Sequence, residues 1–168
     1  MVEVFVSVGS NIAREKNIRS GVRTLREHFT DLQCSSVYES AAEGFDGDPF
    51  YNLVVWFQGQ NLSQINHCLR EIEHQHGRVR QAQKFCSRTL DLDLLLFGDQ
   101  NLHSEGWDIP REEIKRYAFI LRPLAEIAPD RCYPGSSQTM LQLWTLFQQN
   151  HPKILQQIQP IAFEFGFV

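Results

Sequence analysis

The sequence predicts a single α+β domain built on a mainly antiparallel sheet. Strand-like and helix-like segments follow one another in the order strand, helix, strand, strand, helix, strand over residues 2–98. The predicted helices place apolar residues at three- and four-residue steps, whereas the predicted strands are rich in β-branched and aromatic residues. With 168 residues, of which 42% are hydrophobic, the chain is long enough to enclose one substantial core.

The first half of the chain supplies the first four of these elements. Residues 2–11 read VEVFVSVGSN and predict a strand that ends in a tight turn at Gly9. A single apolar face predicts a helix over residues 14–29. The segments that follow are predicted to be a short strand, a loop containing glycine and proline, and a third strand, over residues 34–40, 41–49 and 50–60.

The next segments complete the pattern. Residues 61–77 predict a helix that begins with cap-type polar residues and ends at Gly77. A polar, basic loop follows over residues 79–87, and RTLDLDLLLFG predicts a fourth strand over residues 88–98. This order is that of a split βαβ, or ferredoxin-like, sheet, with helices expected on one face.

The remaining residues predict further helices and a tail. A turn is expected to enter a short helix at Pro110, and a last helix is expected over residues 139–150. The domain is therefore expected to span residues 1–150, followed by a tail over residues 151–168. Alternating large apolar residues make the tail strand-like, at Ile161, Phe163, Phe165 and Phe167. The pattern fits an added edge strand of a monomer, and equally a contact that pairs two copies as a dimer.

Composition excludes several classes of function. A net charge of −4 argues against a general nucleic-acid surface or an anionic-membrane surface. The chain has no run of about 18 apolar residues, as a membrane span would need. The four cysteines form no C-x-x-C pair, which argues against a zinc site and favours reduced thiols in the cytoplasm.

Two acidic residues, Asp91 and Asp93, interrupt the leucines of the fourth strand. Alternate strand residues share a face, so both carboxylates point one way, with Cα atoms about 6.5 to 7 Å apart. The leucines are expected to point the other way, toward the helices: Leu90, Leu92, Leu94 and Leu96. Paired hard oxygen ligands suit Mg²⁺, which takes further ligands from water and phosphate. The alternative is a solvated strand surface, and the stretch alone favours neither.

Cations precede this acidic pair in an otherwise acidic chain. They are Arg78, Arg80, Lys84 and Arg88. A basic loop leading into a strand with two aspartates fits a metal–polyphosphate site. The carboxylates can bind the metal, and each guanidinium group can donate two parallel hydrogen bonds to phosphate oxygens. The alternative is ordinary surface pairing with Glu71 and Glu73. No Walker A sequence is present, which excludes a P-loop protein.

A third pair of candidates lies on the strand over residues 50–60. Phe50 and Asn52 are two residues apart and therefore share a face. Together they offer a ring to stack on a flat heterocycle and an amide to read its edge. Taken alone, the pair is more typical of a core aromatic beside a structural asparagine.

The motifs in combination resemble one enzyme family. VGSN, Phe50-x-Asn52, GRVR, SRTLDLDLLLFG, a later Ile-Pro and AFILRPLAEIAPD occur in order between about Val4 and Asp130. They resemble 6-hydroxymethyl-7,8-dihydropterin pyrophosphokinase of the folate pathway, and R-T-L-D-L-D is the most specific part. The resemblance implies transfer of pyrophosphate from Mg-ATP to the pterin hydroxymethyl oxygen, with release of AMP. ATP is then the co-substrate.

The resemblance also implies roles for individual residues. Asp91 and Asp93 would hold two Mg²⁺ ions on the triphosphate. The pterin would lie between Phe50 and Phe119, with Asn52 reading its edge, Ser40 in its loop and Phe85 in the lid position. The catalytic arginines would be Arg78 and Arg88. The nucleotide would meet Glu73, Arg80, Lys84, Arg111 and Arg116.

Some positions depart from the family pattern. Arg111 stands where a histidine is usual, and Tyr117 stands where an arginine is common. Either Arg111 and Arg116 replace the missing groups in an active kinase, or the chain is a divergent paralogue that binds a pterin or a nucleotide with lost or altered activity. An RNA-recognition module is a weaker alternative, since it would need a basic, aromatic sheet face.

Overall fold

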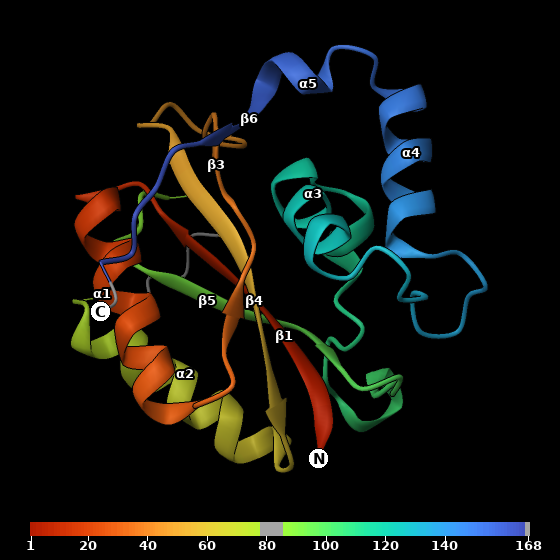
Figure 1. The fold of residues 1–168 in the computed structure, drawn as a ribbon, viewed down its shortest axis with the longest axis horizontal. Coiled ribbons are helices and arrows are strands. Elements are labelled where there is room, and N and C mark those ends of the chain that lie inside the picture. The colour runs from red at the N-terminus through yellow and green to blue at the C-terminus, as the bar shows by residue number, and fades with distance from the viewer. Residues whose placement is uncertain (78–85, 167–168) are drawn as a thin grey trace.

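Six strands of the described chain form one sheet in which every pairing is antiparallel (Figure 1). The computed structural model describes residues 1–77 and 86–166. The strands are β1 (Val2–Ser10), β2 (Gln33–Cys34), β3 (Val37–Ser40), β4 (Phe50–Gly59), β5 (Asp91–Phe97) and β6 (Ile158–Ile161). The order is β5-β1-β4-β3-β6, and the short β2 also pairs with β4. The predicted α+β, split βαβ fold is confirmed.

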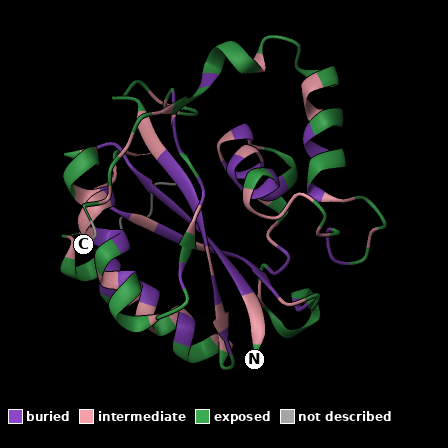
Figure 2. Cartoon of the chain, viewed as in Figure 1, coloured by how far each residue is buried: buried purple, intermediate pink, exposed green. Residues whose placement is uncertain are grey.

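Helices α1 (Arg14–His28) and α2 (Leu62–Gln75) cover one face of this sheet (Figures 1 and 2). The periodic apolar residues of both helices are buried there, and α2 ends at Gln75, just before a left-handed Gly77. They pack on alternate residues of the central strands in one core cluster. The 3.6-residue period of the helices and the two-residue period of the strands together create this layer.

The opposite face is also covered, so the expectation of helices on one face only was wrong. Helices α3 (Ala118–Ile127) and α4 (Met140–Asn150) form a second core with side chains such as Phe5 and Val54. Because the central strands are apolar on both faces, each face needs a helical cover. Short helices complete the chain: η1 (His103–Glu105), η2 (Glu112–Lys115) and α5 (Ile154–Gln157).

A register shift in β5 divides its leucines between the two cores. Val6 pairs with Leu94 and Phe5 with Leu96, so Leu95 is an extra residue on β5. Leu94 therefore packs toward α1 and α2, whereas Leu96 packs toward α3 and α4. The prediction that Leu96 points the same way as Leu94 was wrong, because a β-bulge reverses the alternation beyond it.

Three local predictions also need correction. Gly9 lies inside β1, which continues to Ser10, and makes no turn. The expected strand over residues 34–40 is divided into β2 and β3. The short helix expected to begin at Pro110 begins at Glu112, because Pro110 forms a bend and Arg111 has an extended backbone.

Part of the C-terminal tail forms β6, which pairs with β3 along its outer edge. The register places Ile161 opposite Val37 and Ile158 opposite Ser40. Past β6 the described chain continues toward α1, as Figure 1 shows. None of the described helices has the length and apolar character required to cross a membrane.

Glu126 of α3 links the second helical layer to the start of β3. Its Oε1 accepts hydrogen bonds from the backbone N–H and the hydroxyl of Ser36, at 2.8 and 2.9 Å, and its Oε2 accepts one from the Tyr38 hydroxyl at 2.5 Å. Burial alone would raise the pKa of Glu126, but these hydrogen bonds outweigh it and lower that pKa below its ordinary value.

Replacing Glu126 with Gln should reduce stability in a pH-dependent way. Because the carboxylate is near the surface, solvent screening limits the loss at pH 7 to about 0.5–1 kcal/mol of unfolding free energy. Since the folded pKa is depressed, this contribution exists above the unfolded pKa of about 4.3 and is lost as the pH falls through the folded value. Urea denaturation at pH 7 and pH 3 measures it. The exposed Glu105→Gln is the control, and an equal loss at both pH values would contradict the assignment.

Candidate active site

Adjacent rows of residues across the sheet form the floor of a cavity on the α3 side. The register pairs Gly9 with Asp91 on one neighbouring strand and with Asn52 on the other. In the next row on this face, Ser7 pairs with Asp93. All of these residues line the same cavity. Strand alternation and register therefore set acidic and amide groups side by side, separated by a glycine.

Gly9 makes room for the amide of Asn52. A Cβ atom at residue 9 would lie 3.0 Å from Asn52 Oδ1, closer than most such contacts in proteins. Asn52 is 4% exposed, and its Nδ2 donates a hydrogen bond of 2.9 Å to the Ser40 hydroxyl. The amide is held in one orientation on the cavity floor, so its hydrogen-bonding edge is set before any ligand arrives.

Aromatic rings from separate elements line the same cavity. Phe50 begins β4, and Phe119 lies in the first turn of α3. Each has an aromatic neighbour that also lines the cavity: Phe45 meets Phe50 edge-on at 6.3 Å, and Tyr117 stacks on Phe119 at 5.1 Å. These contacts give the cavity flat apolar surfaces beside its polar floor.

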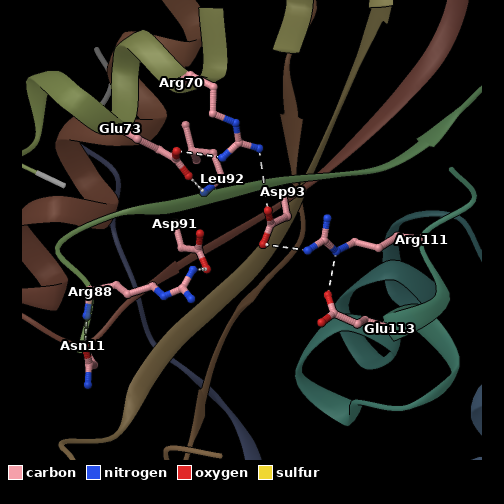
Figure 3. A network of polar contacts seen from close by, with 9 residues as sticks. All are labelled: Asn11, Arg70, Glu73, Arg88, Asp91, Leu92, Asp93, Arg111 and Glu113. Carbon is pink, nitrogen blue, oxygen red and sulfur yellow. Dashed lines mark hydrogen bonds and ion pairs between the residues drawn. The ribbon is translucent and has the colours of Figure 1, made fainter. Parts of the chain in front are cut away.

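Arginines from three parts of the chain surround the acidic pair (Figure 3). Arg88 Nη1 lies 2.7 Å from Asp91 Oδ2. Arg111 Nη2 lies 3.5 Å from Asp93 Oδ2, and Arg70 Nη2 lies 3.7 Å from Asp93 Oδ1. Burial would lower the pKa of Arg88 and of Arg111, but the carboxylates outweigh it and raise both. Both guanidinium groups therefore stay charged beside the carboxylates.

Glu73 supports β5 from the opposite side of the strand, as Figure 3 shows. Its side chain is 2% exposed. Oε1 accepts the backbone N–H of Leu92 at 2.8 Å, and Oε2 accepts Arg70 Nη1 at 2.7 Å. Leu92 is the residue between the two aspartates. Glu73 therefore fixes the backbone that positions both carboxylates and also orients one of the arginines near them.

The VGSN end of β1 holds the start of β5. Asn11 Oδ1 accepts the backbone N–H of Arg88 at 2.7 Å, and the backbone N–H groups of Asn11 and Ile12 both donate to the Arg88 carbonyl. The Ser10 hydroxyl donates to the Thr89 carbonyl at 2.5 Å. These hydrogen bonds restrain the backbone of Arg88, which helps to hold its guanidinium beside Asp91.

The structure brings most of the described candidate residues into this one cavity. Those that line it are Ser40, Phe50, Asn52, Arg88, Asp91, Asp93, Arg111 and Phe119. Glu73 lies behind β5, and Arg116 lines an adjacent groove, where it pairs with Glu112 at 3.3 Å. The candidates Arg78, Arg80, Lys84 and Phe85 lie outside the described residues.

Sequence reasoning missed several residues of the cavity. Ser7, Gly9 and Glu113 are examples, and Glu113 Oε2 accepts a 2.6 Å hydrogen bond from Arg111 Nε. The strand period predicts that Ser7 and Gly9 share a face, but only the pairing with β5 places them beside the aspartates. No local pattern marked Glu113, because α3 and the turn before it reach the sheet only through the tertiary fold.

The donor set of the cavity fits a hard cation. Asp91 and Asp93 present carboxylates to one side of β5, and Mg²⁺ prefers such oxygen ligands. Within residues 1–77 and 86–166, no group of three or more His, Cys, Asp or Glu side chains could hold a metal ion. Mg²⁺ commonly binds through one or two carboxylates and takes its other ligands from water and substrate phosphates, so the two aspartates suffice.

Comparison with known proteins identifies the family. The model of the 7,8-dihydro-6-hydroxymethylpterin-pyrophosphokinase (HPPK) family matches residues 5–129, which include all of β5 and most of its partner strand β1. The chain belongs to the HPPK family. The resemblance predicted from the sequence is therefore confirmed.

Curated relatives agree with this assignment. The chain is 38% identical over 112 residues to the 2-amino-4-hydroxy-6-hydroxymethyldihydropteridine pyrophosphokinase of Synechocystis, which covers 66% of this chain and 57% of that protein. Against the Bacillus subtilis protein of the same name it is 34% identical, covering 73% and 76%. Against the Haemophilus influenzae protein it is 30% identical, covering 81% and 88%.

Solved structures share the fold at low identity. A crystal structure of wild-type Plasmodium falciparum HPPK-DHPS with STZ-DHP superposes with a TM-score of 0.75 at 11% identity and covers 95% of this chain. The present chain covers only 46% of the length of that longer protein. The sheet order and both helical layers therefore correspond to a known architecture.

Replacing Glu73 with Gln tests its supporting role. The change places an amide N–H₂ against either Arg70 or the Leu92 N–H, so one of these donors loses its acceptor on Glu73. We expect the unfolding free energy to fall by about 1–3 kcal/mol, measured by urea denaturation. Glu71→Gln, at an exposed position of the same helix, is the control. Equal stability of the two variants would contradict this role.

Proposed function

We propose that this chain transfers pyrophosphate from ATP to 6-hydroxymethyl-7,8-dihydropterin, with release of AMP. The observation that carries the proposal is the joining of two half-sites in one cavity. Asp91, Asp93 and their arginines form one end, and Asn52 with Phe50 and Phe119 forms the other. A flat heterocycle and a polyphosphate could therefore meet there without a large movement of the sheet.

The aromatic end suits a pterin. Phe50 and Phe119 offer apolar ring faces, and stacking on aromatic rings is favourable for any flat heterocycle. The Asn52 amide combines a donor and an acceptor, which matches the mixed edge of a pterin ring. Ser40 engages the Asn52 Nδ2 and so helps select which way the amide faces.

The charged end suits the polyphosphate. The pterin hydroxymethyl oxygen attacks the β-phosphorus, the bond from that phosphorus to the oxygen shared with the α-phosphate breaks, and AMP departs with that oxygen. Arg88 and Arg111 line the cavity and can donate hydrogen bonds to phosphate oxygens where negative charge develops. Positioning and neutralisation of charge are the main needs of such a transfer.

Asp91 and Asp93 are the residues that would hold Mg²⁺, and we expect two ions. Bound Mg²⁺ would supply charge neutralisation and orientation of the triphosphate oxygens. The chain's own contribution is to fix both carboxylates, because Glu73 holds the Leu92 N–H between them and Arg88 contacts Asp91. Carboxylates held in place lose less conformational freedom when a cation binds.

The departures at positions 111 and 117 are compatible with an active enzyme. Arg111 is a cation directed into the cavity, beside Asp93 and Glu113, and a guanidinium binds phosphate well. Tyr117 stacks on Phe119 and so supports the proposed pterin wall.

The pairing of β6 with β3 within one chain supports a monomer, because the tail covers an edge strand of its own sheet.

The direct test is incubation of the purified protein with Mg-ATP and 6-hydroxymethyl-7,8-dihydropterin, followed by identification of the nucleotide product. Pterin-dependent AMP is the expected result. ADP in place of AMP, or no nucleotide product while pterin still binds by fluorescence titration, would overturn the proposal. The second result would indicate a paralogue that kept the pterin site and lost the transfer.

The acidic pair gives a second test. Asp93→Ala removes a carboxylate that lies between Arg70 and Arg111, so turnover should fall by at least about a hundredfold, and Mg²⁺-dependent binding of ATP should be lost. AMP formation and titration with ATP in the presence and absence of Mg²⁺ measure the effect. Asp31→Ala, at an exposed position distant in sequence from the cavity residues, should retain activity. Retained turnover in Asp93→Ala would rule out the metal assignment.

Asn52→Ala tests the pterin end. Loss of the amide removes hydrogen bonds to the ring edge, so the dissociation constant of the pterin should rise by about ten- to a hundredfold. ATP binding should change little, because Asn52 contacts Ser40 and none of the arginines around the acidic pair among the described contacts. Fluorescence titration with the pterin measures the change. Unaltered pterin affinity would show that the pterin binds elsewhere.

A further inference from the structure

The C-terminal segment, residues 158–166, begins as an edge strand beside β3 and then packs on the α1/α2 side of the sheet, opposite the proposed pterin wall. It lies beyond residues 5–129, the part matched by the family model. Figure 1 shows the chain continuing from β6, beside β3, to α1. This part of the chain therefore meets strands that carry candidate pterin-binding residues, although it does not line their cavity.

The first part of the segment protects the edge of β3. Ile158 is 4% exposed and pairs with Ser40, which is the cavity residue that accepts the Asn52 amide. Without β6, the outer edge of β3 would have unpaired backbone groups just where the loop over residues 41–49 begins.

The second part packs against Tyr51, the residue between Phe50 and Asn52. The rings of Phe163 and Tyr51 meet edge to face at 6.1 Å and 87°. Arg19 of α1 secures this part of the tail: its Nε donates to the Glu164 carbonyl at 3.0 Å, and its guanidinium lies 5.4 Å from the Phe163 ring. The tail is thus held by both a hydrogen bond and ring contacts.

Tyr51 in turn connects to the loop before β4 through Arg14. The Arg14 guanidinium lies 3.9 Å over the Tyr51 ring. The same side chain donates a 2.8 Å hydrogen bond to the Pro49 carbonyl and pairs with Glu39 at 2.7 Å. Pro49 immediately precedes Phe50. The Phe163 ring and the Arg14 cation therefore both contact Tyr51, and together they restrain the backbone that carries Phe50 and Asn52.

We propose that Phe163 is a positioning residue for the pterin: by packing on Tyr51 it holds the start of β4 and the 41–49 loop in the pterin-binding arrangement. Because alternate residues of β4 point to opposite faces, constraint of Tyr51 from behind orients Phe50 and Asn52 in front. The identity of the substrate rests on the proposed function. The restraint of β4 and of the 41–49 loop rests on the described contacts alone.

Phe163→Ala tests the proposal in the full chain. Loss of the ring contact should raise both the pterin dissociation constant and the KM for the pterin by about three- to tenfold, while kcat stays within about twofold. Phe163→Tyr keeps the ring and should restore wild-type values. Leu155→Ala removes an exposed apolar side chain from the same C-terminal region and should have no effect.

Two further measurements locate the effect. Amide hydrogen exchange over residues 41–52 should be faster in Phe163→Ala, with exchange in β5 unchanged as the control for folding. Tyr51→Ala and the double variant complete a mutant cycle, and the two single effects on pterin affinity should not add.

The outcomes separate this inference from the proposed function. Wild-type exchange over residues 41–52 together with unchanged pterin affinity in Phe163→Ala would overturn the positioning role. Equal falls in kcat and affinity, unrestored by Phe163→Tyr, would also overturn it. Failure of the wild-type protein to form AMP would contradict the proposed function. Amide hydrogen exchange over residues 41–52 measures the effect of Phe163 on the loop and β4 without pterin or turnover.

Discussion

Two carboxylates on β5, the strand at one end of the described sheet, are the constraint to which much of this structure responds. Asp91 and Asp93 point to the same side of β5, where they would repel each other and lose hydration without nearby cations. Arg88, Arg111 and Arg70 supply those cations from three separate elements. The contacts to Asp93 are long, which is consistent with a site whose cations can be shared with an anionic ligand.

Several structural features serve to hold that arrangement. Asn11 fixes the backbone of Arg88, and Glu73 fixes the backbone of Leu92. The bulge at Leu95 exposes its carbonyl to the backbone N–H of Arg111 at 2.9 Å, so the register shift in β5 also anchors the approach of Arg111. Strand register and the positions of the charged side chains therefore depend on each other. A shift of β5 along β1 would separate Asp91 and Asp93 from their arginine partners.

One face of the sheet mainly contributes to stability, whereas the other also carries the proposed ligand-binding residues. The α1/α2 face is mainly apolar and forms a continuous core. The α3/α4 face is apolar at the Phe5 end and polar at the Gly9 end, where the cavity opens. Strands β1 and β4 change character along their length, so the same elements that bury a core on one stretch present ligand-binding groups on the next.

Local pattern in the sequence determined the main helices, the central strands and the acidic strand motif, because periodicity and short-range chemistry are encoded within each segment. It also identified Phe50, Asn52 and Arg88 as site candidates from strand alternation and charge, and Arg111 through the family resemblance. Strand pairing decided the rest. Only the tertiary structure placed Gly9 between Asp91 and Asn52, turned Leu96 to the second core, put Glu73 behind β5 and brought Phe163 against Tyr51. Each of these depends on contacts between residues far apart in the chain, and no local period carries that information.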